Sequence, residues 1–125
     1  MTELMTYDRM ALGRRFTPVG FTVDAATLAA YRSIAGRVSD TPTGLLAIQA
    51  RRAYLSEGTM PSGGVMASLE VETLGPLPPD TPLRASAVVT DRAERKGRGW
   101  VTIDVSFAAG AAEFARVRVL GVWPL

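Results

Sequence analysis

Alternating apolar and polar positions in the second half of the chain predict four β-strands. Residues 65–74, 83–90, 101–108 and 114–123 each alternate in this way, which is the period of a strand with one buried face. Four prolines within residues 75–82, a charged stretch at 91–99 and Gly110 separate the four segments. Turn residues at such short intervals are typical of antiparallel strands that follow one another along the chain. The pattern therefore predicts an antiparallel meander.

The first half of the chain has a different pattern. Residues 1–14 show no clear period and predict an irregular N-terminal arm, whereas residues 15–23 are rich in β-branched and aromatic side chains. Pro18 confines that strand to an edge or a bend, because proline cannot donate to a ladder. Asp24 is a typical N-cap, and Leu28 and Tyr31 lie three apart on one face of a helix predicted over residues 25–35.

The stretch from Thr43 to Gly58 predicts the central helix. It begins with a hydroxyl residue that can cap a helix and ends with a glycine that can close one. Its first half is apolar on nearly every side, which is typical of a buried helix. The prediction is therefore an α+β fold, a single domain over residues 1–125, in which an antiparallel sheet wraps around one central helix.

Composition excludes several classes of function. The chain has no histidine and no cysteine, which removes the commonest general base, thiolate nucleophiles and the usual metal ligands. Its acidic residues are scattered, so no metal site is expected. A net charge of +2 is too small to indicate nucleic-acid binding. No apolar run approaches the length of a membrane span, and residues 1–15 do not resemble a signal peptide. We expect a cytoplasmic protein.

Three segments resemble the MaoC-like branch of the hotdog fold. Phe-Thr-Val-Asp at 21–24, leading into residues 25–35, is similar to that family's first strand and first helix. Pro-Thr-Gly-Leu-Leu at 42–46 is similar to the small-residue entry to its central helix. The proline-rich segment 74–83 resembles the crossing between two of its strands. The resemblance implies a homodimer that binds an acyl thioester, as R-specific enoyl-thioester hydratases and 3-hydroxyacyl-thioester dehydratases do. Coenzyme A would enter as part of the ligand, without a separate cofactor.

The chain departs from the family where the catalytic motif is expected. MaoC-like hydratases carry Asp-x-Asn-Pro-x-His after the first helix, but here the region is compressed into residues 38–43 and the histidine has no counterpart. Asp40 is the remaining candidate for a catalytic base, although an aspartate in Ser-Asp-Thr-Pro is more often a turn residue. Three functions stay open: a divergent hydratase or dehydratase, a hotdog thioesterase, and a non-catalytic subunit of a larger assembly.

Gly44 is the strongest candidate for the ligand site. Free N–H groups at the start of a helix attract a carbonyl oxygen or an anion, and glycine lets a ligand approach closely. The resemblance implies that this end polarises the thioester carbonyl, while the alternative is that Gly44 simply fits against the sheet. Further candidates for substrate binding are Leu45 and Gln49 on the same helix, Tyr31 as part of an acyl channel, and Arg95 and Lys96 for a coenzyme A phosphate.

Each further candidate has a plainer alternative. Aromatic residues such as Tyr31, Tyr54 and Trp100 more often belong to a core or an interface, and a charged hairpin is more often simply solvated. Glu57, at the end of the predicted helix, is expected to have a structural or a surface role, and so is Gln49. Dimerisation is predicted in every case, because a small open sheet leaves a strand edge that a second subunit can cover.

Overall fold

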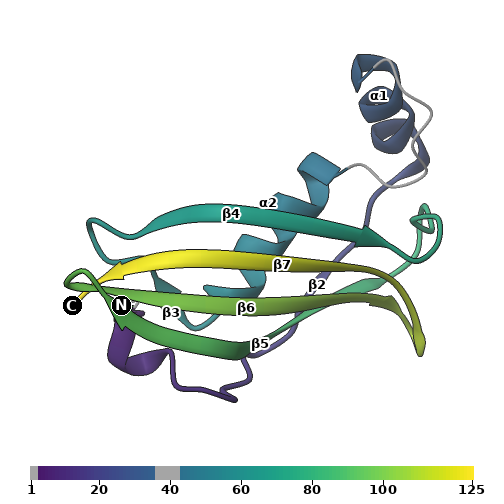
Figure 1. The fold of residues 1–125 in the computed structure, drawn as a ribbon. Coiled ribbons are helices and arrows are strands. Elements are labelled where there is room, and N and C mark those ends of the chain that lie inside the picture. Colours follow the sequence, from purple (N-terminus) through teal and green to yellow (C-terminus); the bar gives the residue numbers. More distant parts are fainter. Residues whose placement is uncertain (1–2, 36–42) are drawn as a thin grey trace.

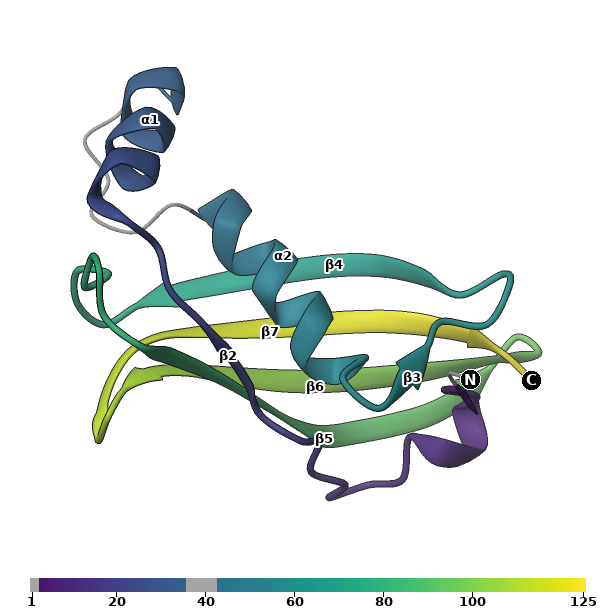
Figure 2. The same cartoon turned by 180° about the vertical axis from the view of Figure 1, so that it is seen from behind.

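The computed structural model describes residues 3–35 and 43–125. These residues form seven strands and two α-helices, with one turn of 3-10 helix near the start (Figures 1 and 2). Their bounds are β1 (Glu3–Leu4), η1 (Tyr7–Arg9), β2 (Val19–Phe21), α1 (Ala25–Ala35), α2 (Thr43–Tyr54), β3 (Gly58–Thr59), β4 (Val65–Thr73), β5 (Leu83–Arg95), β6 (Arg98–Ala109) and β7 (Ala112–Pro124). Within the two described ranges, no helix is long and apolar enough to cross a membrane.

The main sheet has five antiparallel strands in the order β2-β5-β6-β7-β4. The predicted strands are confirmed, and β5, β6 and β7 form a meander, but the prediction that β4 belongs to that meander is wrong. β4 pairs with β7 and lies at the opposite edge from β2. The segment after β4 therefore crosses the end of the sheet to reach β5. Its prolines suit such a crossing, because they cannot serve in a central strand.

The helix α2 lies against one face of this sheet, and the strands curve around it (Figure 2). Side chains from α2 and from the facing side of β5, β6 and β7 make up the centre of the core. The prediction of a buried helix is wrong for one side of its first half, because Ile48 is 55% exposed. The helix also ends at Tyr54, before the predicted Gly58, which begins β3.

The N-terminal segment is part of the core. Met5 and Met10 are fully buried and Tyr7 is 5% exposed. The Trp123 indole Nε1 donates a hydrogen bond to the carbonyl oxygen of Met5 at 2.8 Å, and β1 pairs with β3. An irregular arm was expected over residues 1–14 because these apolar residues follow no regular period. The segment instead closes one end of the sheet.

The helix α1 begins where predicted, and two aspartates hold its start. The Asp24 Oδ1 accepts a hydrogen bond from the backbone N–H of Thr27 at 2.6 Å, which confirms Asp24 as the N-cap and lowers the pKa of its carboxyl. Asp80, from the segment that crosses the end of the sheet, accepts from the backbone N–H of Ala25 at 3.3 Å. Leu28 is buried. These contacts fix α1 beside the crossing segment.

The hairpin between β5 and β6 is longer than predicted. The charged stretch 91–99 was expected to be a loop, but the ladder continues to the pair Arg95–Arg98. Lys96 and Gly97 alone form the turn, with φ of 54° and 72°, as a two-residue turn that matches the twist of its strands requires. The hairpin tip therefore lies at the end of the sheet opposite to α1 (Figure 1).

Candidate functional site

The first turn of α2 is open to a ligand. Gly44 is exposed. Apart from its chain neighbours and the helix's own backbone, no described residue comes within 4 Å of the position that a Cβ would occupy there. Leu45, the next residue, is 9% exposed and belongs to the core. The backbone N–H groups of a first helical turn have no partner within the helix, and the helix dipole places partial positive charge there. This turn can therefore accept a carbonyl oxygen or an anion.

Tyr31 lies at the same end of the molecule as this turn. The helix α1 and the start of α2 both lie toward the end of the sheet that carries the segment from β4 to β5 (Figures 1 and 2). The Tyr31 side chain is half-buried and packs against the core. It stays a candidate for the wall of a site at α2.

The Gln49 side chain is hydrogen-bonded within its own helix. Its side-chain oxygen Oε1 accepts a hydrogen bond from Arg52 Nη1 at 2.7 Å, and the residue is half-buried. A glutamine held in this way is not available to orient a water at the first turn unless Arg52 releases it.

The basic residues of the hairpin lie at the other end of the sheet. Figure 2 shows the start of α2 and the β5–β6 tip at opposite ends of the strands. The Arg95 guanidinium stacks 4.8 Å from the centre of the Trp100 ring, and Lys96 is exposed in the turn. One chain therefore does not bring Arg95 and Lys96 to the same place as Gly44.

The aromatic residues separate into two groups. Tyr54 is 2% exposed within the core, and burial raises the pKa of its hydroxyl, so it forms part of the packing and not of an open channel. Trp100 is half-buried on the face of the sheet turned away from α2. The expectation that aromatic residues serve the core holds for Tyr54.

The remaining acidic candidates give no further centre. Asp40 lies outside the residues that the structure describes. In the described part of the chain, no group of three or more acidic side chains is placed to hold a metal ion.

Glu57 has a structural role, which is one of the two roles expected for it. Its carboxylate accepts hydrogen bonds from the backbone N–H of Thr17 at 2.9 Å and from the Thr17 hydroxyl at 3.1 Å, and it forms an ion pair with Arg14 at 2.5 Å. These contacts join the end of α2 to the segment before β2. They lower the pKa of Glu57, chiefly through the Thr17 N–H and then through Arg14.

We expect Glu57→Gln to lower the free energy of unfolding by about 1 kcal/mol at pH 7, since hydrogen bonds to a charged group are weakened by partial exposure. A carboxyl whose pKa falls on folding stabilises the folded state above its ordinary pKa. The difference from wild type should therefore shrink as the pH falls below 4.5. Urea unfolding at pH 7 and pH 3.5 measures it. Glu94→Gln, on the exposed hairpin, is the matched control, and equal losses for both variants would contradict the role of Glu57.

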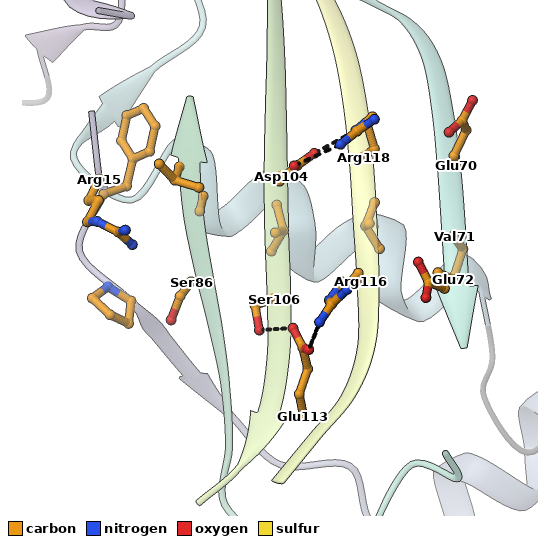
Figure 3. Close-up of a pocket in the computed structure, with 16 residues that line it drawn as sticks. Arg15, Glu70, Val71, Glu72, Ser86, Asp104, Ser106, Glu113, Arg116 and Arg118 are labelled. Carbon is orange, nitrogen blue, oxygen red and sulfur yellow. Dashed lines mark hydrogen bonds and ion pairs between the residues drawn. The ribbon is translucent and has the colours of Figure 1, made fainter. Parts of the chain in front are cut away.

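A hollow of about 810 Å³ lies on the face of the sheet turned away from α2. Charged and hydroxyl side chains from β4, β5, β6 and β7 line it, together with Arg15 (Figure 3). A smaller hollow of about 520 Å³ runs beside α2, between Val19 and the exposed side of Ile48. Neither hollow includes Gly44.

Comparison with known proteins gives matches in structure only. The sequence matches no protein-family model, and no curated protein matches it significantly. Among solved structures, the MaoC-like dehydratase from Rhodospirillum rubrum is 20% identical, with a TM-score of 0.69 over 94% of this chain and 97% of that one. The (R)-hydratase from A. caviae, involved in PHA biosynthesis, is 14% identical, with a TM-score of 0.64 over 91% and 97%.

A mutant of the fluoroacetyl-CoA-specific thioesterase FlK is also similar, at 17% identity, with a TM-score of 0.63 over 90% of this chain and 86% of that one. At these identities the matches show the fold. They confirm the predicted hotdog fold and its resemblance to the MaoC-like members of that fold.

Proposed function

Because the chain has the hotdog fold of MaoC-like dehydratases and (R)-hydratases, we propose that it is a cytoplasmic protein that binds an acyl thioester at the first turn of α2. The acyl group would be carried by coenzyme A or by a carrier protein. The observation that carries the proposal is the open backbone at Gly44, on the one helix around which the sheet curves.

The chemistry of that turn suits a thioester carbonyl. Backbone N–H groups at a helix start are fixed donors, and they stabilise the negative charge that develops on a carbonyl oxygen during addition or proton abstraction. Leu45 is buried next to Gly44, so an apolar side chain lies beside the N–H groups that would bind the carbonyl oxygen. Tyr31 would lie along the acyl chain, and Gln49 would face it only after releasing Arg52.

A non-catalytic binding role is the second candidate. The chain has neither histidine nor cysteine, so the usual acid and base of a hydratase are incomplete. Turnover by this chain would depend on Asp40 as the base of a hydratase or dehydratase, or on a water held at the helix start in a thioesterase. A subunit that binds the thioester and leaves the chemistry to another chain needs neither.

We further propose that the protein is a homodimer. The edge of β4 pairs only with β7 in the described structure, and Val65 and Met66 at its start are more than half exposed. In an antiparallel pair of such edges, the partner's Arg95 and Lys96 would lie toward the same end of the joint sheet as Gly44. A phosphate of the ligand would then meet the basic hairpin of the other subunit.

The test is a thermal-shift titration with acetyl-, butyryl- and crotonyl-coenzyme A, with free coenzyme A as the comparison. A ligand at 100 times its Kd stabilises the protein by about 2.7 kcal/mol, which raises the Tm by roughly 10 °C. Gly44→Val should abolish the shift, because the new side chain covers the first-turn N–H groups. Gly20→Val adds the same side chain on the sheet face turned away from α2 and should keep it.

The outcomes separate the candidates. Stabilisation by none of the esters would overturn the acyl-thioester proposal, and stabilisation that survives Gly44→Val would move the site away from α2. Where binding is found, hydration of the crotonyl ester indicates a hydratase, release of free thiol indicates a thioesterase, and binding without either reaction indicates the non-catalytic role.

A further inference from the structure

The smaller hollow, of about 520 Å³, is a groove between α2 and the edge strand β2, which runs beside this helix (Figure 2). Four of its lining residues are spaced as i, i+3, i+4 and i+7, the spacing of one helix face, namely Ile48, Arg51, Arg52 and Leu55. The Leu55 N–H donates to the Arg51 carbonyl oxygen at 3.1 Å, so this face continues one residue beyond α2. Val19 is the lining residue that β2 contributes.

The groove has an apolar surface. Ile48 is 55% exposed, whereas Leu46 on another side of the same helix is fully buried. Leu55 and Val19 are partly buried and pack against the core. A ligand that covers these three side chains would take apolar surface out of water, which favours binding.

The two arginines of the groove have no acidic partner. Neither Arg51 nor Arg52 forms an ion pair within the part of the chain that the structure describes. Arg52 donates to the neutral amide oxygen of Gln49 at 2.7 Å. Burial raises the pKa of the Tyr54 hydroxyl, and the nearby Arg51 opposes that rise. Glu57, the nearest acidic residue along the chain, is held by the contacts described above. The positive charge of the groove is therefore not offset.

Ser56 adds a hydroxyl group to the same groove. Its Oγ is buried and has no hydrogen-bond partner among residues 3–35 and 43–125. Nearly all buried polar groups in proteins have a partner, so such an atom calls for an explanation. Because a serine hydroxyl moves among three staggered positions by rotation about χ1, it can turn toward a ligand atom in the groove.

The larger hollow, of about 810 Å³, differs in this respect. Two of the three arginines that line it are already paired with carboxylates of the same chain (Figure 3). Arg118 donates to both carboxylate oxygens of Asp104, at 2.8 and 3.1 Å, and Arg116 Nε donates to Glu113 at 2.9 Å. The groove beside α2 is therefore the hollow that combines unpaired arginines with an apolar surface.

We propose that this groove binds the free carboxylate form of an amphiphilic acid, such as a fatty acid of medium chain length. The carboxylate would lie on Arg51 and Arg52, and the alkyl chain would lie along Ile48 and Leu55. A guanidinium donates two parallel hydrogen bonds to a carboxylate, and the Ser56 hydroxyl supplies a further donor. Ligand pockets have volumes of about 300–1,000 Å³, a range that includes this groove. The acyl carbonyl of a thioester carries no charge, so the groove would distinguish a free acid from the ligand proposed at Gly44.

The groove is separate from the sites proposed above. Gly44 does not line it, and Arg51 lies seven residues further along α2, roughly 10 Å along the axis. The strands β2 and β4 are opposite edges of the sheet, so pairing of two subunits along β4 does not use the residues of the groove. Binding of an amphiphilic acid is therefore a function beyond the proposed thioester site.

The test is isothermal titration calorimetry of the full chain with decanoate, below its micelle concentration. We expect saturable binding, and a Kd raised at least tenfold by the double variant Arg51→Gln with Arg52→Gln, since each guanidinium is a charged donor. Arg15→Gln, which removes an exposed arginine from the larger hollow, is the matched control and should leave the Kd unchanged. Circular dichroism confirms that both variants fold.

Two further ligands test the two halves of the proposed contact. Each methylene that leaves water contributes a gain in affinity of roughly threefold to fourfold, so octanoate should bind about tenfold more weakly than decanoate. Decyltrimethylammonium has the same alkyl chain with a positive charge, and it should also bind at least tenfold more weakly.

Four results would overturn the proposal. They are the absence of saturable decanoate binding, a Kd that the double variant leaves unchanged, equal binding of decyltrimethylammonium, and loss of decanoate binding in Gly44→Val. The last variant also separates this proposal from the thioester site, because it should abolish thioester binding and keep decanoate binding. A failed thioester titration would leave the decanoate result unaffected.

Discussion

Replacement of Trp123 by alanine is expected to lower the free energy of unfolding by about 4 kcal/mol. The indole is fully buried on β7, and its Nε1 holds the carbonyl oxygen of Met5. The substitution leaves a large cavity and removes one of the side-chain contacts that join the N-terminal segment to the sheet. Urea unfolding followed by circular dichroism measures the loss.

Two further variants separate the free-energy cost of the cavity from the cost of the lost hydrogen bond. Trp123→Phe keeps most of the ring volume but leaves the Met5 carbonyl without its donor, at a cost of about 2 kcal/mol. Leu125→Ala truncates a neighbouring side chain that is 64% exposed and should change little. A Trp123→Ala protein within 1 kcal/mol of wild type would contradict the packing described here.

Gly99→Ala is expected to destabilise the fold by more than about 2 kcal/mol, because the core has no room for the added methyl group. A Cβ at Gly99 would lie 2.2 Å from Tyr7 Cδ1. The Tyr7 ring is buried, and the Arg92 guanidinium stacks 4.0 Å from its centre, so the ring cannot move aside. Equilibrium unfolding of the variant gives the magnitude.

Gly20→Ala provides the matched control, since its new Cβ meets only the Leu83 carbonyl oxygen at 3.8 Å. The cause is tested by a double-mutant cycle. In a Tyr7→Ala background the added methyl group has space, so Gly99→Ala should cost much less there than in wild type. A cost that is unchanged in that background would show that the strain arises elsewhere.

Local patterns were sufficient to predict the elements and most of their buried faces. Val101, Ile103 and Val105 alternate with polar residues and point into the core, and Asp24 caps α1. The pairing of β4 with β7 could not be predicted in this way, because the partner of a strand depends on contacts far apart in the sequence. Tyr7 was missed for a related reason, since an isolated buried residue in an irregular segment produces no period.

The candidate site was predicted less completely than the fold. The small residue at the start of the central helix, Gly44, is exposed, and its role in binding stays a prediction. The distance between the first turn of α2 and the Arg95–Lys96 hairpin depends on where the strands end. The alternation of apolar and polar residues does not predict those ends. The sequence shows that Glu70 and Glu72 of β4 are acidic and that Arg116 and Arg118 of β7 are basic. That these side chains lie on the same face of the sheet, turned away from α2, follows only from the register of the two strands.

The position of β4 has a consequence for synthesis on the ribosome. Its ladder partner among the described strands, β7, begins about forty residues after β4 ends. At 5–20 residues per second, translation leaves β4 without that partner for roughly 2–8 s. During this interval an apolar strand is exposed to other nascent chains, and charged residues within such a strand oppose aggregation. Glu70 and Glu72 therefore protect the emerging chain before any sheet exists.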